Sequence, residues 1–186
     1  MIRLQRIIAG NRQPTFRSAI YHCEAIMRLS GSAVLPGGCW YNTSQKGDHL
    51  NRLIGFSTDF FGDDSIELAW RPSVNFKEFD IYAFVRIGGK WIRHENRGWD
   101  KINTVTGDKY FYFDVKHRIP DAENPEDCKD ENRLATFAVN GRVVSRRFGV
   151  TPGWAGWIRN FKYGHKDGAP FELTTTLNYS LNLHRD

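Results

Sequence analysis

Apolar and polar residues alternate strictly near the end of the chain, over residues 171–184. Phe171 and Leu173 begin one set, and Glu172 and Thr174 begin the other. A period of two places the two sets on opposite sides of an extended backbone. One side can then be buried while the other meets water, as in an antiparallel sheet with one solvated face. The pattern predicts one long strand.

Short turns join other extended segments into hairpins. Asn140-Gly141 separates residues 134–139 from residues 142–148, and both turn residues tolerate the positive φ of a type I′ turn. The same interpretation gives a turn at Gly88-Gly89 between residues 79–87 and 90–94, and one at 106–108 that leads into the aromatic segment 109–117.

Further extended segments are predicted at residues 4–8, 53–58, 66–71, 102–105 and 154–162. Residues 16–29 are ambiguous, because Tyr21, Cys23 and Ala25 alternate as in a strand while Ile20, Cys23 and Met27 also fit a helical stripe. We interpret this segment as a strand.

The acidic, proline-containing stretch 120–133 cannot bury itself and predicts an exposed charged loop. No linker or internal repeat divides the rest of the 186 residues, so we expect a single domain over residues 1–186. About ten short strands joined by Gly and Asn turns predict an all-β fold, an antiparallel β-sandwich of the jelly-roll or Greek-key kind.

Aromatic residues make up 14% of the chain, which favours strands and also offers flat faces to a ligand. Several stand in Gly- and Pro-rich segments beside polar residues, where they can stack a sugar ring or nucleobase or anchor a protein interface. Packing in the core or at its rim is the alternative explanation, and the simpler one. The candidate ligand-binding residues are Trp40, Tyr41, Arg97, Trp99 and Trp154.

The formal net charge is +5, and the excess is uneven, since residues 140–163 contain no Asp or Glu. Arg142, Arg146 and Arg147 in this stretch are candidate contacts for an anionic partner, either nucleic acid or an acidic protein. A solvated surface of mixed charge is the alternative.

Catalytic and metal-binding signatures are missing from the sequence, which has no G-x-x-x-x-G-K-[ST], G-x-S-x-G or H-E-x-x-H. Three carboxylates in residues 58–65 could attract calcium, but a polar turn explains them better. We predict no catalytic residue, no metal and no cofactor. For an enzyme on this fold, the residues to weigh are His49, Glu67, Asp80, Glu95 and Glu172.

Cys23, Cys39 and Cys128 are odd in number and lack C-x-x-C spacing, which is typical of reduced thiols. The first ten residues do not form a signal sequence, and no stretch has the length of a membrane span. We therefore expect a protein made in the cytosol without a signal peptide, with no membrane partner.

Three segments carry a family resemblance: residues 49–57, residues 65–71 with their Ser-x-x-x-x-Trp-Arg pattern, and residues 79–87, followed by a closing part at 157–170. Together they resemble a loosely defined set of uncharacterised β-sandwich proteins of Bacteroidetes bacteria and their phages. The chain departs from that pattern at 120–133 and at Gly37-Gly38-Cys39-Trp40. The resemblance implies a β-sandwich and a phage setting, and it brings no activity.

The leading functional hypothesis is a non-enzymatic structural or binding module associated with a phage virion, as a decoration, fibre-associated or adhesion protein. Such a module would have protein partners or self-associate, and would be assembled into a virion. Three alternatives stay open: a carbohydrate-binding module, a jelly-roll hydrolase, and an intracellular inhibitor of a bacterial defence system. Function has to be decided at a site, because sandwiches host many unrelated functions.

Overall fold

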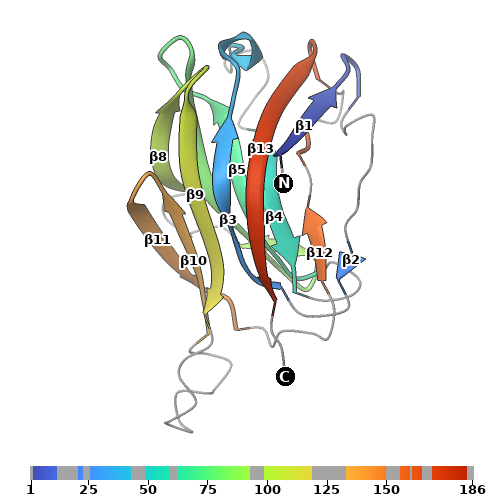
Figure 1. Cartoon of the computed structure of the whole chain (residues 1–186), viewed down its shortest axis with the longest axis vertical. Coiled ribbons are helices and arrows are strands. Elements are labelled where there is room, and N and C mark those ends of the chain that lie inside the picture. The colour runs from blue at the N-terminus through green and yellow to red at the C-terminus, as the bar shows by residue number, and fades with distance from the viewer. Residues whose placement is uncertain are drawn as a thin grey trace, which may run out of the picture.

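The chain forms two antiparallel sheets packed face to face, as the sequence predicted (Figure 1). The computed structural model describes residues 2–11, 21–22, 26–42, 49–58, 63–92, 99–118, 133–149, 156–159, 161–164 and 169–183. Within these residues, no helix has the length and apolar character that crossing a membrane would require.

The first sheet has six strands in the order β1-β13-β3-β9-β10-β11. Its strands are β1 (Ile2–Ile7), β3 (Ile26–Val34), β9 (Tyr110–Arg118), β10 (Leu134–Val139), β11 (Arg142–Arg147) and β13 (Leu173–Leu183).

The second sheet has seven strands, ordered β2-β12-β4-β5-β6-β7, with β8 also paired to β6. Its strands are β2 (Tyr21–His22), β4 (Asn51–Ser57), β5 (Ser65–Pro72), β6 (Glu78–Ile87), β7 (Lys90–Ile92), β8 (Asp100–Thr106) and β12 (Gly156–Arg159). A single 3-10 turn, η1 (Gly37–Cys39), follows β3 in the part of the chain that the structure describes.

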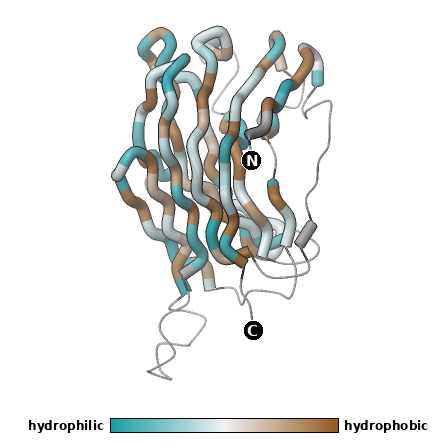
Figure 2. Tube along the Cα trace, viewed as in Figure 1, coloured by the Kyte–Doolittle hydropathy of each residue, from teal (hydrophilic) through white to brown (hydrophobic). Residues whose placement is uncertain are grey.

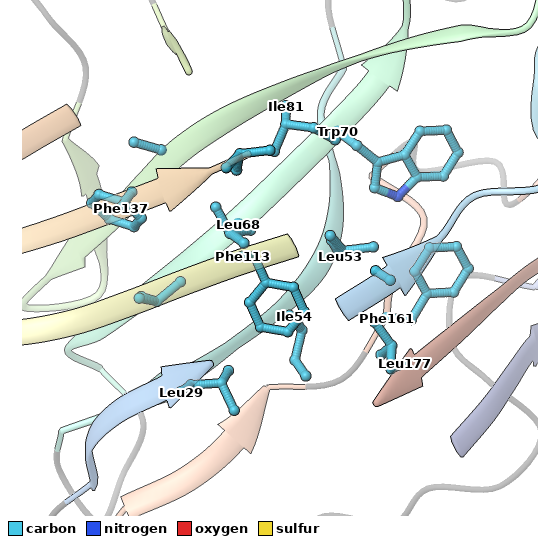
Figure 3. Packing of buried hydrophobic residues seen from close by; sticks show 14 of the residues in the cluster. Leu29, Leu53, Ile54, Leu68, Trp70, Ile81, Phe113, Phe137, Phe161 and Leu177 are labelled. Carbon is cyan, nitrogen blue, oxygen red and sulfur yellow. The ribbon is translucent and has the colours of Figure 1, made fainter. Parts of the chain in front are cut away.

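The core lies between the sheets and is filled from alternate strand positions. Figure 2 shows apolar and polar segments following each other along the strands. In Figure 3, Phe113 and Leu177 from the six-stranded sheet meet Leu53 and Leu68 from the seven-stranded sheet. Trp70 is fully buried, stacked on Phe161 and edge-on to Phe79, so it belongs to the interior.

The sheets are also joined along one side, where β8 lies beside β10 and β11. The guanidinium of Arg146 binds the carboxylate of Asp100 across this side. Nearby, Asn103 Nδ2 donates to the carbonyl of Val139 at 3.1 Å. These contacts join the sandwich through polar groups where the apolar core ends.

Most strands agree with the predicted segments to within a few residues. Asn140 and Gly141 both have positive φ, of 48° and 81°, as the predicted turn requires. Gly88 and Gly89, at 55° and 78°, do the same. The predicted loop at 120–133 lies outside the described residues except for Arg133.

The predicted strand at 16–29 is wrong in its extent. Tyr21–His22 pairs with β12 in the seven-stranded sheet, whereas Ile26–Val34 pairs with β13 and β9 in the other sheet. The two strands therefore belong to different sheets, and the second continues through Ser30-Gly31-Ser32. These residues resemble a turn, which explains why their alternation was missed.

Close backbone packing explains the glycine in β3. A Cβ on Gly31 would lie 2.0 Å from the carbonyl oxygen of Asn178 on β13, nearer than real Cβ atoms approach any atom. β13 lies between β1 and β3, and it pairs with β1 over residues 173–178 and with β3 over residues 176–183.

We expect Gly31→Ala to destabilise the fold by about 3 kcal/mol, near the upper end for forced overpacking, because β3 and β13 would have to separate. Urea unfolding with an unchanged m-value measures the loss. Gly38→Ala is the control, since nothing lies within 4 Å of its added Cβ. Equal stability of the two variants would contradict the close approach.

Candidate functional site

The outer face of the seven-stranded sheet collects charged and aromatic side chains from alternate positions of six strands. We call it the cationic face. Its members are Arg52 (β4), Glu67 and Arg71 (β5), Asp80, Tyr82, Phe84 and Arg86 (β6), Lys101 (β8) and Arg159 (β12), together with Trp91 (β7) and Trp99.

Glu67 is the centre of this face. It points outward between the core residues Ile66 and Leu68, yet it is fully buried. Arg52 Nε binds its Oε2, and Arg159 Nε donates to Oε1 at 3.1 Å. Ser65 Oγ also donates to Oε1, at 2.9 Å, so each carboxylate oxygen accepts at least one hydrogen bond.

Opposing effects act on the pKa of Glu67. Burial raises this pKa, but the charges of Arg52 and Arg159 and the bonds from Ser65 and Arg52 outweigh it, so the pKa lies below the ordinary value. Burial lowers the pKa of Arg52, and Glu67 opposes that effect. Glu67 is thus a fixed anion that cannot serve as a proton donor near neutral pH.

Asp80 forms a second charged group nearer the start of β6. Lys101 Nζ lies 2.7 Å from its Oδ1, Thr104 Oγ1 donates to the same oxygen at 2.8 Å, and Tyr82 Oη lies 3.4 Å from Oδ2. Burial raises the pKa of Asp80, but the bonds from Lys101 and Thr104 and nearby positive charge bring it below the ordinary value. Asp80 is therefore also held as an anion.

An aromatic cluster lies at the other end of the face. Phe84 packs against Trp91 and Trp99, with ring centroids 4.0 and 4.6 Å apart. The Arg86 guanidinium lies 5.5 Å from the Trp91 ring, and Arg86 Nε donates to the carbonyl of Gly89 at 3.0 Å. Trp91 is 38% exposed, so its indole meets solvent beside a fixed cation.

Positive charge exceeds negative charge on the described part of this face. Five cations, Arg52, Arg71, Arg86, Lys101 and Arg159, lie with Glu67 and Asp80, and with Asp63, whose carboxylate is 4.0 Å from Arg86. The side chains of Arg52, Arg159 and Arg86 keep 15%, 20% and 25% of their surface exposed. The face can therefore offer guanidinium groups, already fixed in place, to an anion.

The predicted ligand-binding residues do not form one platform. Trp40 donates from Nε1 to the carbonyl of Ser73 at 3.1 Å and packs edge-on to Phe76. The backbone N–H of Ser73 donates to the carbonyl of Glu78, so Trp40 lies near the start of β6. Trp99 packs on Phe84, which is six residues further along β6, or roughly 20 Å. Trp40 and Trp99 are therefore at opposite ends of that strand.

Tyr41 is part of the rim of the core. Its hydroxyl accepts a hydrogen bond from Asn51 Nδ2 at 2.8 Å, and its ring lies against Tyr163 and Phe171. Burial raises the pKa of Tyr41 well above the ordinary value. Arg97 and Trp154 lie outside the described residues, so their predicted roles stay predictions.

The three arginines predicted to contact an anionic partner differ in their surroundings. Arg146 is opposite the core residue Ala135 and binds Asp100. Arg142 and Arg147 are exposed at the two ends of β11, the last strand of its sheet. Arginines on an edge strand also discourage pairing with other chains, so this placement has a structural explanation as well.

Other polar residues weighed from the sequence are dispersed. His49 is exposed, Glu172 pairs with Arg6 at the surface, and Glu95 lies outside the described residues. The described residues contain no group of three or more His, Cys, Asp or Glu side chains placed to hold a metal ion.

The sequence offered Glu67 only as one of several residues to weigh for an enzyme, and no local pattern indicated that arginines would bind it. The arginines that bind Glu67 come from β4, 15 residues before it, and from β12, 92 residues after it. Arg52, Arg159 and Glu67 meet only because β12 pairs with β4 and β4 pairs with β5. No local sequence motif predicts either pairing.

The sequence matches no protein-family model, and no curated protein matches it. Solved structures are similar in fold. Alginate lyase AlyC3 in complex with dimannuronate aligns over 98% of this chain and 75% of its own, with a TM-score of 0.54 and 9% identity.

Two further structures resemble the chain more loosely. Alginate lyase vAL-1 from Chlorella virus has a TM-score of 0.49 at 10% identity, over 98% of this chain and 85% of its own. The CBM2 module of the evolved Dit protein of Lactobacillus casei BL23 phage J-1 has a TM-score of 0.42 at 13% identity, over 87% and 64%. At such identities the likeness to AlyC3 shows the jelly-roll sandwich and nothing about activity.

We expect Glu67→Gln to cost about 3–5 kcal/mol of unfolding free energy, because two guanidinium groups would lose a buried counter-charge. Glu172→Gln removes an exposed carboxylate that is also paired with arginine, and should change stability by less than about 1 kcal/mol. Denaturant unfolding of both variants at pH 7 makes the comparison. Similar small losses would mean that Glu67 is solvated.

The same carboxylate should make the protein sensitive to acid. A lowered folded-state pKa means that the stabilisation by Glu67 is complete above its ordinary value of 4.5 and is lost as the pH falls through the folded-state pKa. The unfolding free energy of the parent chain should therefore fall more steeply below about pH 4.5 than that of Glu67→Gln, measured by urea titrations at successive pH values. If the unfolding free energies of the parent and of Glu67→Gln change with pH in parallel, the prediction is contradicted.

Proposed function

We propose that this protein is a non-catalytic glycan-binding module, and that its cationic face holds an acidic oligosaccharide. The observation that carries the proposal is the excess of fixed, partly exposed guanidinium groups beside the indole of Trp91 on one sheet face. A uronate unit has both a carboxylate, which guanidinium groups bind in paired geometry, and a ring face that packs on an aromatic surface.

Arginine side chains that are already held in one conformation favour binding, because little conformational entropy is left for the ligand to remove. Arg86 is held by the carbonyl of Gly89 and lies over Trp91, and Arg71 lies over the ring of Tyr82 at 5.1 Å. Arg52 and Arg159 are held by Glu67. Binding then costs little further side-chain entropy.

The state of the carboxylates favours binding over glycoside hydrolysis. Hydrolysis needs two carboxyl groups about 5–9.5 Å apart, one of them protonated. Glu67 lies opposite Phe84, and Asp80 is four residues before Phe84 on β6, which separates their backbones by roughly 13 Å. Both carboxylates are held as anions by cations.

The fold supports the choice of a first ligand to test. The AlyC3 structure contains dimannuronate, and the chain shares the sandwich on which that complex is built. Uronate oligosaccharides are therefore the probe, with sulfated and uncharged glycans of similar length beside them.

We expect uronate oligosaccharides to bind, with an affinity that falls as salt is raised, because the contact is between exposed charges. Trp91→Ala and Arg86→Gln should each weaken binding about tenfold, as removal of a central aromatic or arginine contact does. Isothermal titration calorimetry measures the affinity, and ultraviolet absorbance of unsaturated uronates monitors cleavage.

Arg147→Gln provides the matched control, since it removes an exposed arginine from the other sheet and should leave affinity within twofold. No binding of any acidic glycan, or equal binding by parent and Trp91→Ala, would overturn the proposal. Release of unsaturated products would make the protein a lyase and overturn its non-catalytic part.

The setting we propose for this module is a phage virion, where a glycan-binding protein would serve adhesion to a host surface. Its support is the sequence resemblance of residues 49–57, 65–71 and 79–87 to proteins of Bacteroidetes bacteria and their phages. Synthesis in the cytosol is part of the same proposal.

Mass spectrometry of purified particles from the source phage should detect the protein in proportion to the known structural proteins. Particles that lack it, from a lysate that contains it, would remove the virion setting and leave the glycan-binding proposal to its own test.

A further inference from the structure

Two tyrosines project from the start of β9, a central strand of the six-stranded sheet, on the face opposite to the core. Tyr110 and Tyr112 are 67% and 69% exposed, and both belong to β9, which has β3 and β10 as its neighbours. They alternate with the buried Phe111, so their rings project on one side, about 7 Å apart along the strand. Large exposed rings on the outer side of a central strand do not contribute to the core and are typical of contact surfaces.

The side chains around these rings are small and uncharged. On the neighbouring strand β3, Val34 is opposite Tyr110 and Ser32 is opposite Tyr112. On the next strand, β13, Thr176 is opposite Val34 and Asn178 is opposite Ser32. Asn140 follows β10 on the other side, and its Oδ1 accepts the backbone N–H of Tyr112 at 2.9 Å. We call this surface the tyrosine face. Its members are Tyr110, Tyr112, Ser32, Val34, Asn140, Thr176 and Asn178, with Ser30 and Ser180 in the next row.

The charges closest to the tyrosine face neutralise one another. Arg28 binds both oxygens of Asp114, at 2.8 and 3.1 Å, and Lys116 Nζ lies 2.9 Å from Asp114 Oδ2. All three lie further along the sheet than Tyr112, on β3 and β9. The tyrosine face therefore differs in chemistry from the cationic face, on the other side of the sandwich.

We propose that the tyrosine face is a second binding surface, which takes an uncharged glycan chain stacked on Tyr110 and Tyr112. Rows of hydroxyl and amide groups can donate to and accept from sugar hydroxyls, and the apolar faces of sugar rings pack on the two phenol rings. Single-stranded nucleic acid also stacks on aromatic side chains, but its phosphates require a positive groove, and here the nearby arginine and lysine already bind Asp114.

The test uses hydroxyethylcellulose, galactomannan and soluble β-1,3-glucan in native affinity gels with the full chain. At least one of these should retard the parent protein, and the retardation should change little between low and moderate salt. Tyr110→Ala combined with Tyr112→Ala should weaken the retardation at least tenfold. The double Tyr→Phe variant keeps both rings and should retain most of it.

Folding and the proposed function are checked separately. Both tyrosines are largely exposed, so the Ala variant should unfold at nearly the parent denaturant midpoint and should still bind uronate oligosaccharides. Trp91→Ala, conversely, should still bind the neutral polysaccharide. Failure of this second site and failure of the cationic face are therefore told apart.

Three results would overturn the inference. One is that none of the three polysaccharides retards the folded parent. Another is that the double Ala variant is retarded as strongly as the parent. The third is that the parent forms a dimer that the Ala variant does not, by analytical ultracentrifugation, since the tyrosine face would then contact a second copy of the chain.

Discussion

Two sheets share one apolar interior, and each strand that lines it must send alternate side chains inward. Trp70, Phe79 and Phe161 show how tightly that interior is filled, with one stacked and one edge-on contact around a single indole. Once those positions are committed to the core, the residues between them point outward whatever their chemistry. Glu67 between Ile66 and Leu68, and Tyr112 between Phe111 and Phe113, are placed in this way. The core thus decides which residues form the two outer faces.

Glu67 and its partners Arg52, Arg159 and Ser65 carry a large desolvation free energy. Desolvating a carboxylate and two guanidinium groups costs several kcal/mol per ion, and well-packed apolar residues of similar volume often stabilise a protein as well or better. Arg52, Arg159 and Ser65 compensate much of that cost through direct bonds. The same bonds fix the guanidinium groups of Arg52 and Arg159, on which the proposal for the cationic face depends.

Local sequence patterns predicted the fold well and the site poorly, for a physical reason. Asn140-Gly141 and Gly88-Gly89 specify their own turns, and the alternation over residues 173–183 specifies its own strand, because the relevant contacts lie within a few residues. β3 was misjudged at Gly31, where the requirement is set by the carbonyl of Asn178, far along the chain.

The same limit applies to function. Trp40, Tyr41 and Trp99 were chosen as ligand-binding candidates because aromatic residues stand there among polar ones. In the folded chain, Trp40 and Tyr41 lie apart from Trp99. The groups that do meet, around Glu67 and around Tyr112, depend on the register of β12 with β4 and of β3 with β9, which are strands distant in sequence.

The back-to-back arrangement of the sheets has a geometrical consequence. Sheets in such a sandwich are about 10 Å apart, and their outer sides look in opposite directions. The ligands proposed for the two sides differ in charge, so two occupied sides would mean two different chains held by one small protein. Such a protein is a cross-link, able to tie an acidic strand of a matrix to a neutral one without forming an oligomer.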